Sequence, residues 1–183
     1  DGAKAISYDD GVADGRINYI PQSVIDSYLD EVSKQGIHTD LVKSSGLKVV
    51  YTPLNGTGNK PVRAILKKIG VEDVTVVPEQ EYPDGNFPTC PFPNPEIKEA
   101  LAKGLELCNV VKPDLLLATD PDCDRVGIAV PSDNGYELFT GNEVGAMLLE
   151  YICSERTKMG TMPADPVAVK TIVTTDITKA ICK

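Results

Sequence analysis

Short apolar runs recur through the middle of the chain, each bounded by turn-forming residues. Runs of four or five apolar or β-branched residues predict strands, and they occur at residues 47–51, 74–77 and 115–118. Two further runs, 126–130 and 136–139, lie on either side of an Asn-Gly pair, which favours a tight hairpin turn. The pattern therefore predicts three separate strands followed by a β-hairpin.

Between these runs, apolar residues return every three or four positions, as on one face of an amphipathic helix. The predicted helices are residues 21–35, 61–69 and 95–107. Strands that alternate with helices predict an α/β fold of three α/β/α layers, with a mostly parallel sheet and helices on both faces. We expect the hairpin to add an antiparallel edge to that sheet.

The two ends of the chain differ from this central part. Residues 1–20 show no periodicity and contain two Asp-Gly turn pairs, so we expect a loop or linker. Beyond the hairpin, the pattern predicts a helix over 142–154, a strand over 167–173 and the start of a helix over 176–182. The last strand and half-helix are typical of the opening βα unit of another domain.

Composition narrows the class of function. The 183 residues include 27 acidic and 18 basic side chains, a formal net charge of −9. That balance argues against nucleic acid or an anionic membrane surface as a partner. No run of about 18 uncharged apolar residues occurs, which argues against a transmembrane helix. Because the chain lacks an initial Met, we expect it to be part of a longer protein.

The cysteine count bears on the cellular compartment. There are five cysteines, an odd number, and no two of them form a Cys-x-x-Cys pair. A disulfide framework is therefore a poor interpretation, and a reducing, cytoplasmic location is favoured. We expect the thiols to lie in or near the core.

One cluster of polar residues carries most of the chemistry. Asp120, Asp122 and Asp124 follow the apolar run 115–118 directly, and Arg125 comes next. In α/β sheets, ligands bind beyond the carboxyl ends of the strands. Three carboxylates so close together repel one another unless a cation lies between them, and oxygen ligands favour Mg²⁺. An arginine beside such a site suits a phosphate group.

The same residues fit other interpretations to different degrees. Asp and Pro are common in turns, so the three aspartates could be turn residues only. An EF-hand loop does not fit, because Arg125 stands at its glycine position and Pro131 at its glutamate position. A haloacid-dehalogenase-type phosphotransferase also places Asp-x-Asp after a strand, with Asp120 as the nucleophile. A free-standing, non-catalytic module that binds metal or phosphate is a further alternative.

A glycine-rich turn after the first predicted strand invites a phosphate-loop interpretation. Residues 56–60 read Gly-Thr-Gly-Asn-Lys, but the nucleotide-binding P-loop needs four residues between its first glycine and its Gly-Lys pair. We expect instead a strand-to-helix turn in which the glycines adopt unusual dihedral angles.

The segment Thr119–Arg125 resembles the metal-binding loop of the α-D-phosphohexomutases, the phosphoglucomutase/phosphomannomutase family. Other segments are similar to that family in its own order: Pro53–Gly58, Asp84–Pro88, Pro93–Glu96 and Thr140–Glu143. The resemblance implies a linker from a preceding domain at 1–18, the family's second, metal-binding domain at 19–140 and the first part of its third domain at 141–183.

The resemblance also implies an activity. Family members interconvert hexose 1-phosphates and 6-phosphates through an enzyme phosphoserine and a bisphosphate intermediate, an isomerase reaction that proceeds by phosphoryl transfer. It implies that Asp120, Asp122 and Asp124 bind Mg²⁺ and that Arg125 orients phosphate. The phosphoserine loop, the sugar-binding loop and the C-terminal phosphate loop of the family do not occur in these residues. We therefore expect the first and fourth domains to be missing and the chain to be inactive alone, with glucose phosphate the preferred substrate of the whole enzyme.

Overall fold

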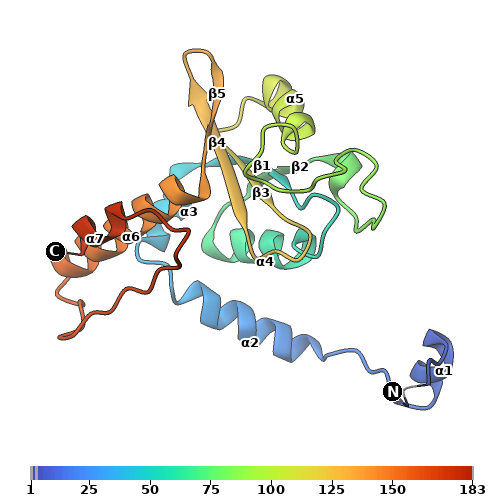
Figure 1. Ribbon diagram of the computed structural model, residues 1–183. Coiled ribbons are helices and arrows are strands. Elements are labelled where there is room, and N and C mark those ends of the chain that lie inside the picture. The colour runs from blue at the N-terminus through green and yellow to red at the C-terminus, as the bar shows by residue number, and fades with distance from the viewer. Residues whose placement is uncertain (1, 3, 183) are drawn as a thin grey trace. The chain divides into compact units, whose positions relative to one another are not determined.

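The computed structural model describes residues 2 and 4–182, and it divides into two compact units, with the boundary along the chain between Gln35 and Gly36. The first unit contains helices α1 (Tyr8–Ala13) and α2 (Gln22–Ser33) (Figure 1). Helix α2 confirms the prediction for residues 21–35. Helix α1 was not predicted: Ser7 caps it by accepting a hydrogen bond from the Asp10 amide at 3.1 Å, which satisfies one of the free amides of the first turn.

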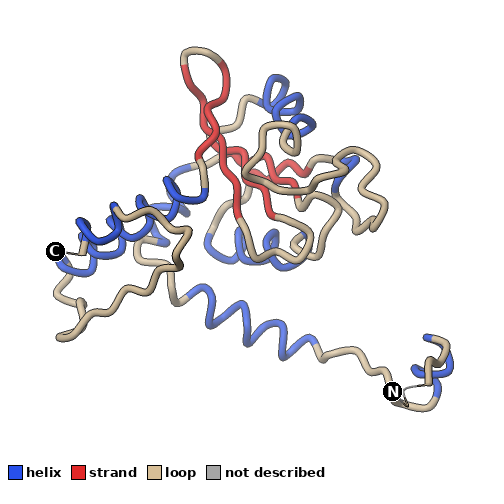
Figure 2. The backbone as a smooth tube through the Cα atoms, in the orientation of Figure 1, coloured by secondary structure: helices blue, strands red, loops and turns tan. Residues whose placement is uncertain are grey.

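The second unit is built on a five-stranded sheet (Figure 2). In the order of the sheet, the strands are β2 (Asp73–Val76), β1 (Lys48–Thr52), β3 (Leu115–Thr119), β4 (Val126–Ser132) and β5 (Gly135–Phe139). Strand β1 pairs in parallel with β2 and β3, whereas β4 is antiparallel to β3 and β5. The predicted strands and edge hairpin are confirmed, and the hairpin makes the sheet a mixed one.

Helices cover both faces of this sheet, which confirms the α/β/α class. Alternate residues of a strand point to opposite faces. In β1, Val49 and Tyr51 pack toward α3 (Thr39–Ser45) and α4 (Asn59–Ile69), whereas Val50 packs toward α5 (Ala102–Val111). The sequence pattern did not predict α3, and α4 begins two residues before Pro61. The two faces together form the hydrophobic core of this unit.

The predicted helix over 95–107 is wrong in its bounds, because α5 begins only at Ala102. The preceding residues form tight turns in which amides bond three residues back, as from Ala100 to the Ile97 carbonyl at 3.2 Å. Pro95 lies against β4, where a side chain on Gly127 would overlap its carbonyl group. The chain therefore stays irregular up to Leu101, although Ala100 and Leu101 are buried as expected.

The C-terminal part contains α6 (Gly141–Lys158) and α7 (Ile177–Ile181). The strand predicted over 167–173 does not form, and Val169 and Ile172 are 93% and 99% exposed. A strand needs a neighbouring strand to satisfy its backbone groups, and none pairs with this segment among the described residues. Its β-branched residues therefore remain in irregular backbone, and Ile172 and Val173 lie in a turn that the Thr174 amide closes by donating to the Thr171 carbonyl at 3.2 Å.

Two further observations bear on the sequence expectations. Cys90 and Cys108 are buried and all five thiols are free, but Cys182 is exposed, so the core placement expected for it is wrong. In the part of the chain that the structure describes, no helix combines the length and apolar character needed to cross a membrane.

Candidate metal centre

The three predicted aspartates lie on a tight turn at the carboxyl end of β3, a strand flanked on both sides by others. The Cys123 amide donates to the Asp120 carbonyl at 3.0 Å and closes the turn. Cys123 itself has a φ of 63°, a left-handed conformation that costs a non-glycine residue roughly 1–2 kcal/mol. This sharp reversal keeps the second and third aspartates close to the end of the strand.

The turn brings all three carboxylates together. One oxygen from each of Asp120, Asp122 and Asp124 lies within 4.8 Å of the others. Asp120 is buried, whereas Asp122 and Asp124 are exposed. The sequence prediction placed these residues in one cluster, and the structure has that cluster.

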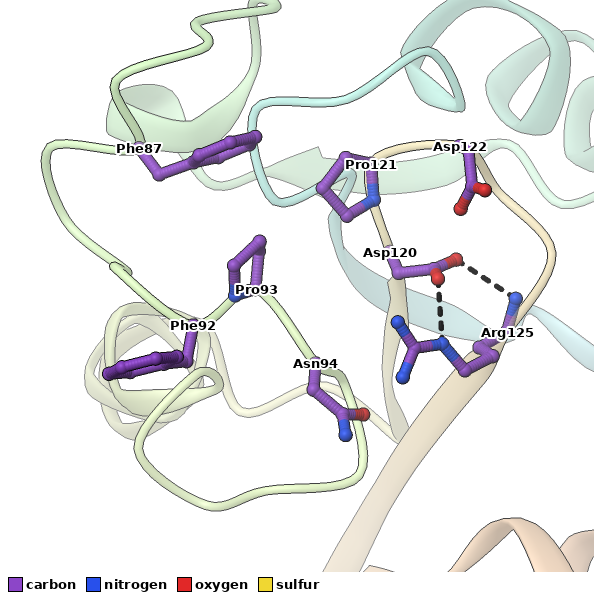
Figure 3. Close-up of a pocket in the computed structure, with 8 residues that line it drawn as sticks. All are labelled: Phe87, Phe92, Pro93, Asn94, Asp120, Pro121, Asp122 and Arg125. Atoms are coloured by element: carbon purple, nitrogen blue, oxygen red, sulfur yellow. Dashed lines mark hydrogen bonds and ion pairs between the residues drawn. The ribbon is translucent and has the colours of Figure 1, made fainter.

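Asp120 is held by both of its carboxylate oxygens (Figure 3). Its Oδ1 accepts hydrogen bonds from the Asp124 and Arg125 amides at 3.0 and 2.9 Å. Its Oδ2 accepts one from Nε of Arg125 at 2.8 Å. Burial raises the pKa of Asp120, but the hydrogen bonds from the Arg125 amide and guanidinium outweigh it and leave the pKa below its ordinary value. The residue is therefore an ionised, fixed carboxylate.

Asp124 is in the opposite electrostatic situation. Several effects raise its pKa. The largest is hydrogen bonding with the Asp120 side chain, and the next is repulsion from the negative charges of Asp122 and Asp120. The side chain of Asp124 is 73% exposed and lies 3.8 Å from Nε of Arg125, which offsets only part of the repulsion. The cluster thus carries more negative charge than its one arginine neutralises.

The donor set fits a hard divalent cation. Every candidate ligand atom is a carboxylate oxygen, the type that Mg²⁺ prefers, and Mg²⁺ usually retains several waters or substrate oxygens. Two of the three carboxylates face solvent, so a bound ion would keep positions open for an external phosphate. A thiol is a poor ligand for Mg²⁺, which leaves Cys123 a structural residue of the turn.

A pocket of about 450 Å³ adjoins the cluster. Its polar wall includes Asp120, Asp122 and Arg125, and its opposite wall comes from the proline-rich loop before α5 (Figure 3). That loop contributes Phe87, Phe92, Pro93 and Asn94. The sequence pattern did not predict that this segment takes part in the site. Its aromatic residues between prolines were the available signal.

The glycine-rich turn between β1 and α4 also reaches the cluster. The expectation of unusual glycine dihedrals is wrong, because the left-handed residues of this turn are Leu54 and Asn55, with φ of 48° and 57°. Gly56 is required instead by close approach: a Cβ there would overlap the backbone of Pro121. Two loops far apart in the sequence therefore pack directly against each other.

Comparison with known proteins identifies the family. Residues 26–135 match the family described as "Phosphoglucomutase/phosphomannomutase, alpha/beta/alpha domain II". The chain belongs to the phosphoglucomutase/phosphomannomutase family. This membership, which the sequence resemblance predicted, decides against the haloacid-dehalogenase alternative.

Individual family members agree with this result. The chain is 33% identical to a phosphoglucomutase of Staphylococcus aureus (strain MRSA252) over 91% of its residues and 29% of that protein. It is 33% identical to a phosphoglucomutase of Staphylococcus saprophyticus over 93% of its residues and 30% of that protein. The chain thus spans less than a third of the length of these relatives.

The fold is shared with a solved structure of the family. A phosphoglucomutase/phosphomannomutase family protein from Burkholderia thailandensis superposes with a TM-score of 0.60 at 19% sequence identity. The match covers 80% of this chain and 31% of that one. It confirms the α/β fold.

Proposed function

We propose that this chain provides the metal-binding part of a phosphohexomutase, an enzyme that interconverts hexose 1-phosphate and hexose 6-phosphate through a phosphoserine and a sugar bisphosphate. Residues 19–140 act as the metal-binding domain, and residues 141–183 begin the domain that follows. The observation that carries the proposal is the convergence of three carboxylates at the end of β3, in a chain whose family contains phosphoglucomutases.

In this proposal, Asp120, Asp122 and Asp124 hold Mg²⁺. The ion, when bound, neutralises negative charge on a phosphoryl group in transfer, which is the main requirement of that chemistry. Asp120 acts as the fixed ligand, since its carboxylate is buried and bonded through both oxygens. Asp122 and Asp124 are free to adjust, because both are exposed.

Arg125 has two roles in the proposal. Its amide and Nε keep Asp120 ionised and oriented. Half of the Arg125 side chain is exposed. The other N–H groups of its guanidinium border the pocket and can donate to a phosphate oxygen. A planar guanidinium suits phosphate, since two of its N–H groups match two phosphate oxygens.

The sugar-binding groups and the phosphoserine would be supplied by parts of the enzyme other than residues 1–183. The proposed sugar is glucose phosphate, in keeping with the phosphoglucomutase relatives. We expect no mutase turnover from this chain alone, because a phosphoryl acceptor on the enzyme and the sugar-binding groups must be aligned with the metal. Turnover by the purified chain in a coupled phosphoglucomutase assay would contradict this expectation.

Metal binding by the chain itself tests the proposal. Isothermal titration with Mg²⁺, and electron paramagnetic resonance with Mn²⁺ as a substitute, should both reveal one site. Removing a residue that only orients a metal ligand weakens metal affinity about 10–100-fold. Asp122 is a proposed ligand itself, so Asp122→Asn should weaken Mg²⁺ binding by at least about tenfold. Asp133→Asn removes a carboxylate from the exposed hairpin turn and should leave affinity unchanged. Equal binding by both variants would refute the assignment of the site.

A further inference from the structure

The turn between β1 and α4 contacts the aspartate turn at one peptide group. Two donors of Thr57 converge on the Pro121 carbonyl: the backbone amide at 2.8 Å and the side-chain hydroxyl at 3.0 Å. Pro121 stands between Asp120 and Asp122. The peptide that Thr57 binds therefore joins Pro121 to Asp122, between the first two proposed ligands along the chain.

The neighbouring glycines allow this contact. A Cβ on Gly56 would overlap Pro121, and one on Gly58 would lie 2.6 Å from Tyr51 Oη and 2.7 Å from Thr119 Oγ1. Atoms at such distances would have to shift, so only glycine lets the two turns approach this closely. The geometry is thus specific to the pairing of these loops rather than a chance contact between surface segments.

The other end of the aspartate turn is fixed from within the sheet. The hydroxyls of Tyr51 and Thr119 lie 2.9 Å apart in a buried hydrogen bond, and Thr119 precedes Asp120. The strand side of the turn is therefore held by β1, and Asp120 by Arg125. The peptide after Pro121 has no comparable support from its own strand, and Asp122 beyond it is exposed.

We propose that Thr57 is a positioning residue for the metal site: its hydroxyl and amide fix the Pro121–Asp122 peptide and hold Asp122 near Asp120 against their mutual repulsion. This inference rests on the proposed metal-binding function. Both hydrogen bonds of Thr57 go to a backbone carbonyl and not to a carboxylate of a proposed ligand. It acts through the backbone between two ligands, as groups that orient metal ligands do in other sites.

The test is Mn²⁺ affinity, measured by electron paramagnetic resonance on the full chain. Thr57→Val removes the hydroxyl and keeps both the branched shape and the amide. We expect Mn²⁺ binding to weaken by about tenfold, while Tm in chelator changes little because Thr57 is an exposed residue. Thr57→Ser restores a hydroxyl and should recover most of the affinity.

A matched control separates positioning from general stability. Thr157→Val also removes an exposed hydroxyl that donates to a backbone carbonyl, that of Cys153 at 2.7 Å, but on α6. It should leave Mn²⁺ affinity unchanged. If the unchanged chain binds Mn²⁺ and Thr57→Val binds equally well, or Thr57→Ser fails to rescue, the positioning role is overturned and the metal site stands. If the unchanged chain binds no Mn²⁺, the proposed function fails and this inference fails with it.

Discussion

Replacing Arg125 with glutamine tests how the buried carboxylate is kept in place. The side chain of Asp120 is only 2% exposed, and Nε of Arg125 donates to its Oδ2 at 2.8 Å. A glutamine cannot supply that charged donor. Asp120 would keep its two hydrogen bonds from backbone amides but would lose the positive charge that favours its ionised form.

The expected cost follows from these contacts. A hydrogen bond to a charged group contributes about 1.5–3 kcal/mol, and water screening of the half-exposed arginine reduces this to about 1–2 kcal/mol. For a chain of this size, each kcal/mol corresponds to a Tm change of about 2–4 °C. The variant should therefore melt about 2–8 °C lower at neutral pH in a chelating buffer.

The pH dependence gives an independent check. The folded pKa of Asp120 lies below its ordinary value of 3.8, so the stability it contributes is complete above that value and is lost as the pH falls through the lowered folded pKa. Without the guanidinium the folded pKa rises. The difference in Tm between the two proteins should thus be full near pH 7 and shrink below about pH 4.

Circular dichroism melts of both proteins at pH 7 and pH 3.5 would measure these effects. Arg63→Gln is the matched control: Arg63 is 46% exposed, against 50% for Arg125, and pairs with Glu81 at 2.7 Å. Glu81 is 23% exposed, so water can replace the lost partner, and the cost should stay below about 1 kcal/mol. Equal losses for the two variants, or a loss at Arg125 that is the same at both pH values, would refute the reasoning.

Three further predictions concern the body of the fold. Lys112 ends α5 with a φ of 53°, so Lys112→Gly should raise Tm by about 1–4 °C; a melt no higher than that of Lys112→Ala would contradict this. Leu116 is fully buried, and Leu116→Ala should cost about 2–5 kcal/mol in urea denaturation. Burial raises the pKa of Cys108 to about 11, so a thiol reagent at pH 8 should label the exposed Cys182 well before Cys108; equal labelling rates would argue against that burial.

The sequence predicted the elements that depend on neighbours close along the chain. Strands β1 and β3 are buried on both faces of the sheet, and such strands carry nearly continuous apolar runs. Those runs made both strands predictable from the sequence. Residues 167–173 carry a similar pattern but stay irregular, since no strand of the described chain pairs with them. Helix α1 depends on one capping serine, Ser7, rather than on periodicity. The local pattern thus indicates which secondary structure a segment favours, whereas strand pairing and helix capping decide whether that structure forms.

The candidate site shows the same contrast between what local sequence predicts and what depends on contacts far apart in the chain. Three aspartates spaced two apart after a buried strand can be recognised directly, because one short turn brings them together. The Thr57–Pro121 contact spans 64 positions and could not be derived from spacing. The placement of Phe87 and Asn94 on the pocket that Arg125 also lines likewise depends on the path of a long loop. Sequence reasoning located the three aspartates and missed the pocket walls and the supporting contacts around them.

The unequal burial of the three aspartates affects how quickly an ion could exchange. Asp120 is buried just after the end of β3, while Asp122 and Asp124 are exposed. At the proposed site, releasing or capturing an ion would need only rotation of these two exposed side chains, a motion of picoseconds to nanoseconds, and no rearrangement of the backbone. Since Mg²⁺ sheds its hydration water reluctantly, the slow step of exchange would belong to the ion and its water shell rather than to the protein.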